Sequence, residues 1–152
     1  LNTMCVEARE AKWRAILPSG PSETRVAEER GRVLGWISTG PCRDEDATPT
    51  DGELWAMYLH PDHWRRGIGQ ALWDAGRSSL AAAGFSAATL WVLTGNERAR
   101  RFYAANGFAP DPGHQKTFQL CGEIIPELRM RARILHRLSV APEGSHADND
   151  LR

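Results

Sequence analysis

The sequence predicts one α/β domain. Its 152 residues, with a mass of 16.9 kDa, suit a single hydrophobic core. Two uninterrupted apolar runs, residues 54–59 and 88–93, are each followed by a segment in which apolar residues recur every three or four positions. The apolar runs are typical of strands covered on both faces. The recurrence every three or four positions is typical of amphipathic helices. Strand, helix, strand, helix along the chain is the α/β pattern.

The segments before the first buried strand predict a helix and a hairpin. Residues 4–17 carry apolar side chains at loose helical spacing, and a Pro-Ser-Gly-Pro sequence follows them. Residues 24–29 and 32–39 alternate like strands on either side of Arg30-Gly31, where glycine can take the positive φ of a tight turn. We therefore expect a short helix, a β-hairpin and then a loop over residues 40–52.

The later segments complete the predicted domain. The long helix begins at Gly67 and ends before Gly84, and the second helix spans residues 96–106 and stops at Gly107. Strands are expected at residues 116–121 and 127–134, with Arg129, Arg131 and Arg133 on one face toward solvent. Residues 139–152 are polar and aperiodic, which predicts a domain over residues 1–138 and a disordered tail.

Composition excludes several classes of protein. Nineteen basic residues balance nineteen acidic ones, so no global charge favours a nucleic-acid partner. No apolar run approaches the roughly 18 residues of a membrane-spanning helix. Three cysteines without C-x-x-C spacing argue against a disulfide framework or structural zinc, and we expect no metal site. The first ten residues lack the features of a secretory signal, which predicts a cytoplasmic protein.

The junction at residues 60–71 predicts an anion site. It joins a buried strand to a helix through Gly67-Ile68-Gly69, with Arg65 and Arg66 beside the glycines. Free N–H groups at a helix start attract anions, and glycine lets the backbone approach phosphate oxygens closely. The residues do not form a P-loop, because only one residue separates the glycines and no lysine follows. They do not fit the dinucleotide fingerprint either, because position 72 is leucine and no acidic residue follows about 20 positions later.

Together with a second motif, this junction resembles the GNAT superfamily of acyl-CoA-dependent N-acyltransferases. The first motif is His60-Pro61-Asp62 followed by Gly67-x-Gly69, and the second runs from Asn96 to Phe108 as NERARRFYAANGF. The two stand in the family's order, one helix and one buried strand apart, and the similarity extends over about residues 24–134. The resemblance implies a mixed, mostly antiparallel sheet, splayed between residues 54–59 and 88–93 to admit acetyl-CoA.

The resemblance also implies which residues bind and react. The pyrophosphate of acetyl-CoA would lie on Arg65, Arg66, Gly67, Ile68, Gly69, Gln70 and Ala71. The pantetheine arm would pair with Met57, Tyr58 and Leu59 and pass near Asn96. Tyr103 would protonate the leaving thiolate as general acid. Glu53, expected on the same face of the strand as Trp55 and Met57, would act as general base directly or through water. A backbone N–H near Met57 or Tyr58 would polarise the thioester carbonyl.

Two departures from the family pattern leave alternatives open. Position 64, usually Gln or Arg, is tryptophan, and an N-terminal strand is apparently missing. The chain is then either truncated or builds its acceptor side differently, for instance with a partner subunit in a homodimer. The predicted activity is acetyl transfer to a primary amine of a small molecule or peptide, and a non-catalytic CoA-binding module is the alternative. A purely structural interpretation stands beside each functional one. Tyr103 is then a plain core aromatic, Glu53 a solvated strand end and the acidic residues 44–46 a solvated loop.

Overall fold

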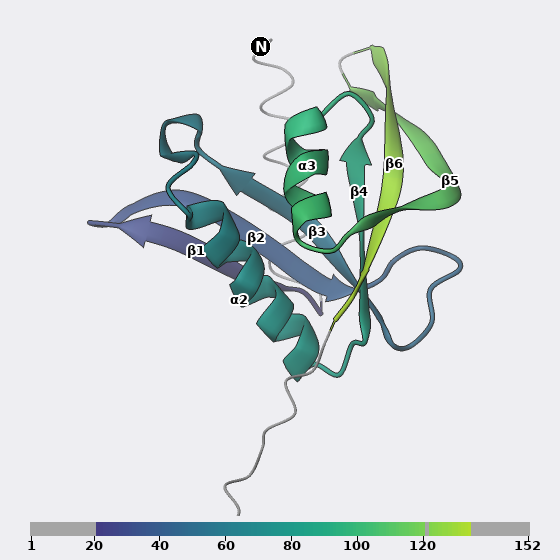
Figure 1. Cartoon of the computed structure of the whole chain (residues 1–152), viewed down its shortest axis with the longest axis horizontal. Coiled ribbons are helices and arrows are strands. Elements are labelled where there is room, and N and C mark those ends of the chain that lie inside the picture. Colours follow the sequence, from purple (N-terminus) through teal and green to yellow (C-terminus); the bar gives the residue numbers. More distant parts are fainter. Residues whose placement is uncertain (1–20, 121, 135–152) are drawn as a thin grey trace, which may run out of the picture.

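Six strands form one sheet with two helices against one face (Figure 1). The computed structural model describes residues 21–120 and 122–134. In chain order the elements are β1 (Glu23–Glu29), β2 (Arg32–Pro41), β3 (Asp51–Leu59), the 3-10 turn η1 (Pro61–His63), α2 (Ile68–Ala82), β4 (Ala87–Leu93), α3 (Glu97–Ala105), β5 (Ala109–Leu120) and β6 (Glu123–Arg133). The strand order is β1-β2-β3-β4-β6-β5. The predicted helix over residues 4–17, the missing N-terminal strand and the tail over 139–152 lie outside the described residues.

The predicted hairpin is present, and its turn has the expected geometry. Arg30 and Gly31 both have positive φ, 52° and 78°, in a two-residue turn between Glu29 and Arg32. Two central residues with positive φ match the right-handed twist of antiparallel strands. The local sequence was therefore sufficient to predict this element.

The sheet is mixed and mostly antiparallel, as predicted. Only β3 and β4 run parallel, and they pair only from Asp51–Ala87 to Leu54–Leu90. Beyond Leu54, the described part of β3 pairs with β2 alone. The predicted splay between the two strands is thus confirmed, and it leaves one backbone edge of β3 unpaired over its last residues.

A β-bulge lies at the point where β3 leaves β4. Thr39 pairs with Leu54 and Ser38 with Ala56, so Trp55 is an extra residue opposite β2. The bulge reverses which side chains face the helices. Leu54 packs in the core before the bulge, and Met57 packs against the core after it. The expectation that Glu53 and Met57 share a face was therefore wrong, because simple alternation fails across an inserted residue.

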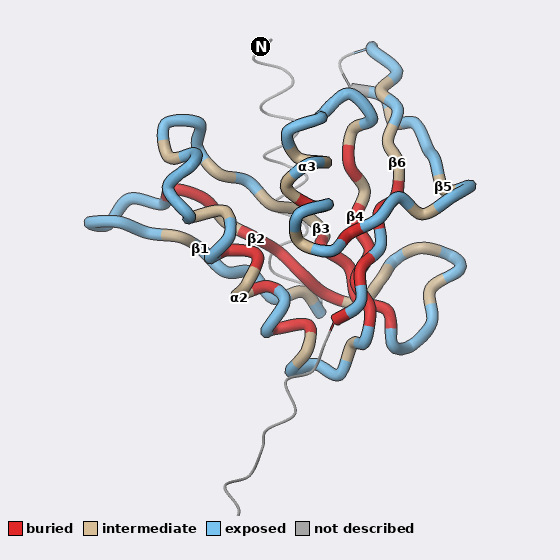
Figure 2. Tube along the Cα trace, viewed as in Figure 1, coloured by how far each residue is buried: buried red, intermediate tan, exposed pale blue. Residues whose placement is uncertain are grey.

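The hydrophobic core lies between the sheet and the two helices. In Figure 2 the buried stretches concentrate along β2, β3, β4 and the inner side of α2. Trp73 of α2 packs at a tilt against Phe108, with ring centroids 5.1 Å apart, and Phe108 also contacts Tyr103 of α3. Both predicted helices are confirmed with similar bounds. In the described residues no helix is long and apolar enough to cross a membrane.

The C-terminal strands are longer than predicted. β5 begins at Ala109 rather than Lys116 because the Asp-Pro-Gly sequence, read as a turn, is accommodated inside the strand. Pairing with β6 jumps from Pro110–Met130 to Gln115–Leu128, and Gly113 has a φ of 83° there. The Asp111 side chain next to this irregularity accepts a 2.8 Å hydrogen bond from Arg129.

Candidate functional site

The junction between β3 and α2 presents a bare helix N-terminus. Arg65 and Gly67 have positive φ, 60° and 77°, and α2 begins at Ile68 with no side-chain cap. The first intrahelical bond is donated by the Ala71 N–H to the Gly67 carbonyl at 3.0 Å. The N–H groups before it point out of the helix start and carry its partial positive charge. This geometry suits a phosphate group.

Trp64 ties this loop to two other elements. Its indole Nε1 donates a 3.0 Å hydrogen bond to the Leu59 carbonyl at the end of β3. The guanidinium of Arg98 lies over its ring, with Cζ 3.7 Å from the ring centroid. Arg98 belongs to the first turn of α3, so the contact joins the separated ends of β3 and β4. Sequence reasoning singled out position 64 only as a departure from the family pattern and missed its contact with Arg98.

Apolar side chains line the space between β3 and the start of α2. A Cβ placed on Gly69 would lie 3.6 Å from Met57, 3.7 Å from Phe102 and 3.9 Å from Leu59. Met57 and Leu59 thus lie next to Gly69. Tyr58 points to the other face of the sheet, where it is exposed. Phe102 was not predicted to be part of the site, although its position next to Tyr103 in the second motif could have indicated it.

Three of the predicted polar groups have structural partners. Asn96 caps α3 by accepting a 3.1 Å hydrogen bond from the Ala99 N–H. Gln70 donates to Asn106 Oδ1 at 2.8 Å and so links the start of α2 to the end of α3. Arg66 contacts His63 Nδ1 at 2.8 Å and Glu29 at 3.7 Å. No local pattern could have indicated the Gln70–Asn106 contact, because it joins residues 36 positions apart.

Tyr103 lies on the inner face of α3. Its ring packs edge-on against Phe102 and Phe108, with centroids 5.5 and 5.8 Å away. Burial raises the pKa of Tyr103 to about 12. The phenol therefore keeps its proton at neutral pH. Within the described residues its hydroxyl makes no hydrogen bond, so the O–H is available as a donor.

Glu53 is buried and hydrogen-bonded to Arg43, so it is not a solvated strand end. The backbone N–H and Nε of Arg43 both donate to Oε2 at 3.0 Å, and Nη2 donates to Oε1 at 2.6 Å. The Arg43 guanidinium also lies 4.2 Å from the ring centroid of Trp55. Arg43 was not anticipated from the sequence. Its position next to an acidic run gave no sign that it pairs with a carboxylate ten residues away.

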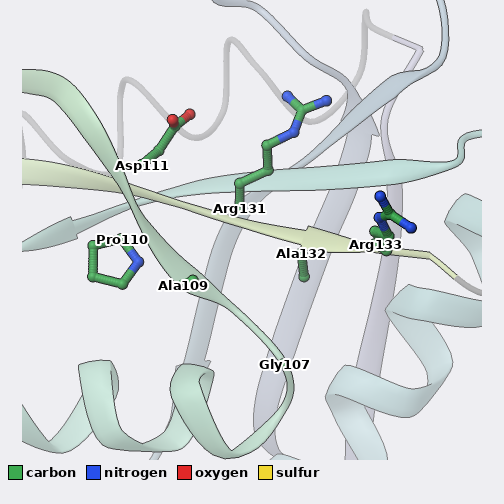
Figure 3. A pocket seen from close by; sticks show the side chains of 7 residues that line it. All are labelled: Gly107, Ala109, Pro110, Asp111, Arg131, Ala132 and Arg133. Carbon is green, nitrogen blue, oxygen red and sulfur yellow. The ribbon is translucent and has the colours of Figure 1, made fainter.

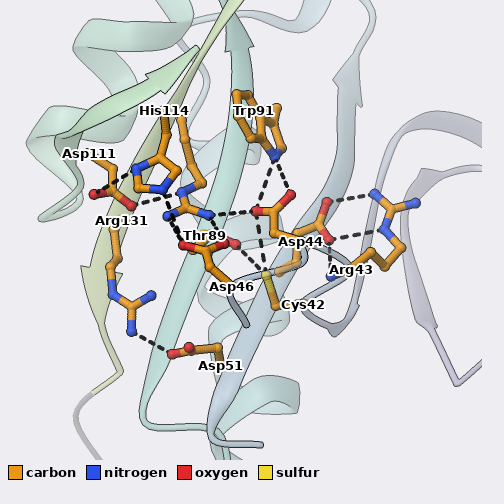
Figure 4. Close-up of polar contacts among 12 residues, drawn as sticks. Cys42, Arg43, Asp44, Asp46, Asp51, Thr89, Trp91, Asp111, His114 and Arg131 are labelled. Atoms are coloured by element: carbon orange, nitrogen blue, oxygen red, sulfur yellow. Dashed lines mark hydrogen bonds and ion pairs between the residues drawn. The ribbon is translucent and has the colours of Figure 1, made fainter. Parts of the chain in front are cut away.

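The loop carrying Arg43 is anchored by a buried arginine (Figure 4). Arg129 of β6 donates to Asp46 at 2.6 Å, to Asp111 at 2.8 Å and to Asp44 at 3.1 Å. These hydrogen bonds hold the pKa of Asp46 well below its usual range. Trp91 adds a 2.9 Å bond from its indole to Asp44. The acidic loop is therefore docked on the sheet rather than solvated.

The arginines of β6 depart from the predicted solvent-facing row. Arg129 is 3 % exposed, and Arg131 pairs with buried Asp51 at 2.5 Å, while Arg133 is exposed as expected. Burial opposes ionisation of Asp51, but hydrogen bonds from Thr48 and Arg131 outweigh it and hold its pKa below the usual value. Alternation placed the three arginines on one face correctly. It could not show that a loop from another part of the chain covers that face.

Two surface hollows lie elsewhere. One of about 340 Å3 follows the end of α3 along β5 and β6 (Figure 3), and it is lined by Gly107, Ala109, Pro110, Asp111, Arg131, Ala132 and Arg133. The other, of about 360 Å3, is lined by Glu97, Arg100, Arg101, Ala104, Pro110 and Met130. Neither is lined by a residue of β3 or of the loop before α2. In the described residues no group of three His, Cys, Asp or Glu is placed to hold a metal ion.

Comparisons with known proteins agree with this arrangement. The profile of the acetyltransferase (GNAT) family matches residues 4–108. The uncharacterized N-acetyltransferase YuaI of Bacillus subtilis is 33 % identical over 128 residues, which cover 84 % of this chain and 70 % of YuaI. A mycothiol acetyltransferase of Acidimicrobium ferrooxidans is 34 % identical over 113 residues, covering 73 % of this chain but only 34 % of that protein.

A solved structure shares the fold. The acetyltransferase yncA of Salmonella typhimurium, described with its cofactor acetyl-CoA, superposes with a TM-score of 0.66. Its sequence is 21 % identical, and the match covers 90 % of this chain and 78 % of that one. The family profile, the B. subtilis relative and the splayed sheet lead to the same result: the chain belongs to the GNAT family of acetyltransferases.

Proposed function

We propose that the protein transfers an acetyl group from acetyl-CoA to a primary amine. The observation that carries the proposal is the pairing of two features at one end of β3. In the described residues its last positions have a backbone edge without a strand partner, and the uncapped start of α2 follows after the short turn η1. A strand edge suits the amides of the pantetheine arm, and a helix start suits the pyrophosphate. Acetyl-CoA carries both groups in one molecule.

The binding residues follow from this placement. Backbone groups of Met57, Tyr58 and Leu59 would pair with the pantetheine arm, with the Leu59 carbonyl already accepting from Trp64, and the side chains of Met57 and Leu59 would flank it. The backbone of residues 65–71 would bind the pyrophosphate, with charge from Arg65 and Arg66. We keep Asn96 in this set through its position at the start of α3, although its side-chain oxygen already caps that helix.

Acetyl transfer needs proton movements at two places. The acceptor arrives as an ammonium and must lose one proton before its nitrogen attacks the thioester carbon. As the C–N bond forms and the C–S bond breaks, the sulfur receives a proton and the nitrogen loses its second. We assign the first step to Glu53 and the donor at the sulfur to Tyr103. A backbone N–H near Met57 or Tyr58 would stabilise the carbonyl oxygen. The net products are an amide, the free thiol and one proton released to solvent.

The environment of Tyr103 defines how it can serve. With a pKa of about 12, it stays protonated at neutral pH. Complete transfer to a thiolate of ordinary pKa, about 8.5, would cost roughly 5 kcal/mol. The hydroxyl is therefore better suited to donating a hydrogen bond as charge develops on the sulfur than to giving up its proton early. Its location in a buried aromatic cluster fixes the direction of that bond.

A CoA-binding module without catalysis is the second candidate. The observation that favours it is that Arg43 donates three hydrogen bonds to Glu53 and so fills most of the acceptor positions of that carboxylate. The two candidates share the coenzyme site and differ only in turnover.

A thermal melt with acetyl-CoA tests the shared site. At about 100 times its dissociation constant, the ligand adds about 2.7 kcal/mol of stability, which raises Tm by about 5–10 °C for a chain of this size. The substitution Gly67→Asp puts a negative charge at the phosphate position. Gly31→Asp is the matched control, because both glycines have φ near 77° and neither would bring a Cβ within 4 Å of another atom.

The expected result is that Gly67→Asp abolishes the ligand-induced shift and Gly31→Asp retains it. Both variants should lose a similar amount of stability without ligand, because both place an L-residue at positive φ. A shift that survives in Gly67→Asp would mean that the coenzyme binds elsewhere.

A further inference from the structure

The pair formed by Arg43 and Glu53 lies beside the bulge of β3, on the face away from the helices. Glu53 and Trp55 are on the face of β3 opposite the helices, whereas Met57 and Leu59 face α2. The coenzyme and the acceptor would thus approach β3 from opposite faces of the sheet. Any acceptor amine directed at the bulge meets the Arg43 guanidinium on the acceptor face.

The backbone around Arg43 is held in place, but not every N–H group of its guanidinium has a hydrogen-bond partner in the described residues. Its backbone neighbours are fixed, since the Cys42 N–H donates to the Asp51 carbonyl at 2.9 Å and Asp44 is bound by Trp91 and Arg129. Its side chain is 50 % exposed, against 4 % for Glu53. Nε and Nη2 bind Glu53, while within the described residues Nη1 has no hydrogen-bond partner. Because the guanidinium is planar, Nη1 lies on the side away from the edge that binds Glu53. A planar fork with a free outer edge suits a second carboxylate.

Charge balance then restricts the acceptor. Arg43 donates three hydrogen bonds to Glu53, so an ammonium that binds the same carboxylate must share it with the guanidinium or displace one of those bonds. A simple amine would leave two cations, Arg43 and the ammonium, competing for one buried carboxylate. An acceptor that carries its own carboxylate removes this conflict, because Arg43 exchanges one carboxylate for another and the ammonium takes its place on Glu53.

We propose that the acceptor is a zwitterionic, amino-acid-like amine, with its carboxylate on Arg43 and its ammonium on Glu53. The inference rests on the proposed acetyl transfer and adds the substrate class. The ammonium proton passes to Glu53, the freed amine forms the C–N bond, and the C–S bond breaks with Tyr103 donating at the sulfur. Arg43 keeps its charge and proton throughout and acts only as a specificity determinant.

Matched acceptors and matched variants test the inference. The acceptors are phenylalanine with phenethylamine, lysine with cadaverine, and tyrosine with tyramine, each amino acid beside its decarboxylated amine. The measured quantity is the ratio of kcat/KM within each pair, in the wild type and in Arg43→Gln. The change in this ratio from wild type to variant is independent of the intrinsic reactivity of the amines and of any loss of folded protein. Arg77→Gln is the control, because Arg77 is also half-exposed and paired with one carboxylate, Asp74 at 3.4 Å, but lies on α2.

If Arg43 makes a charged hydrogen bond to the carboxylate of the acceptor, Arg43→Gln lowers the ratio about 10- to 100-fold and Arg77→Gln leaves it unchanged. Arg43→Lys, which keeps the charge but loses the fork, should fall between wild type and Arg43→Gln and provides a folded variant if Arg43→Gln is unstable. An unchanged ratio in both Arg43 variants would overturn the inference, and so would turnover confined to amines without a carboxylate.

A thermal melt with acetyl-CoA separates this failure from failure of the proposed function. If the coenzyme raises Tm but every pair is inert, the zwitterionic acceptor is wrong and the coenzyme site stands. If the coenzyme does not raise Tm, acetyl transfer is wrong and the inference falls with it.

Discussion

Replacing Arg129 with methionine is the most direct test of how the acceptor face is built. Arg129 is buried and binds Asp44, Asp46 and Asp111 at 2.6–3.1 Å. Methionine fills much of the same space and removes the charge and all of these bonds. Two of the carboxylates, Asp44 and Asp111, are themselves mostly buried and would be left without their cation.

The expected loss follows from that burial. Removing one partner of a buried ion pair costs about 3–5 kcal/mol. The lower end applies here, because Asp46 is half-exposed and water can solvate it once Arg129 is gone. A loss of about 3 kcal/mol corresponds to a decrease in Tm of about 6–12 °C for a chain of this size.

The assay is a thermal melt at neutral pH, with Arg133→Met as the control. Arg133 lies on the same strand and the same face but is exposed, so its substitution should move Tm by no more than about 2 °C. If Arg129→Met and Arg133→Met were equally mild, the loop over residues 42–50 would not depend on Arg129, and its role as an anchor would be refuted.

Three further predictions concern the active residue, the packing of the sheet and the response to acid. Tyr103→Phe should lower kcat/KM by about 100-fold or more while leaving Tm unchanged, because the hydroxyl has no hydrogen bond in the described structure. The proposed donor is the neutral phenol, and its pKa is raised to about 12, so wild-type activity should show no loss from this group below about pH 11 in a pH–rate profile. Gly35→Ala should cost about 2–3 kcal/mol in urea denaturation, because its Cβ would lie 2.5 Å from the backbone oxygen of Tyr58; an unchanged midpoint would contradict this packing. Arg129 lowers the pKa of Asp46, so its stabilisation is present above the unfolded value of about 3.9 and is lost as pH falls below it. Tm of Arg129→Met should therefore fall less steeply with acid than that of wild type.

Local features of the fold were predictable because neighbouring residues determine them. The Arg30-Gly31 turn, the start of α2 at Gly67, the end of each helix before a glycine and the two buried strands all depend on φ preferences or periodicity within a few residues. The splay between β3 and β4 came from the resemblance to a family rather than from periodicity. It is visible in the structure as parallel pairing that ends at Leu54.

Long-range contacts explain what the sequence did not reveal. Arg129 looks like one of three alternating surface arginines until a loop 83 residues earlier in the chain places Asp46 on it. Arg43 likewise pairs with Glu53 through a loop whose path no periodicity encodes. A complementary signal was present in the acidic residues 44–46 and the basic residues 129–133. Charge pattern alone does not give the register that brings them together.

The bulge at Trp55 has the largest consequence for the site. Strict alternation would place Glu53, Trp55 and Met57 on one face, and the proposed base would then point toward the coenzyme side of β3. The inserted residue instead divides the strand, with Glu53 and Trp55 on the face covered by the anchored loop and Met57 and Leu59 against α2. Because the bulge coincides with the end of β3–β4 pairing, the same residue that reverses the faces also marks where the sheet opens. An amine arriving over Arg43 and a thioester arriving along Met57 could then meet at the opening without competing for the same surface, which is the geometric requirement for direct transfer between two bound substrates.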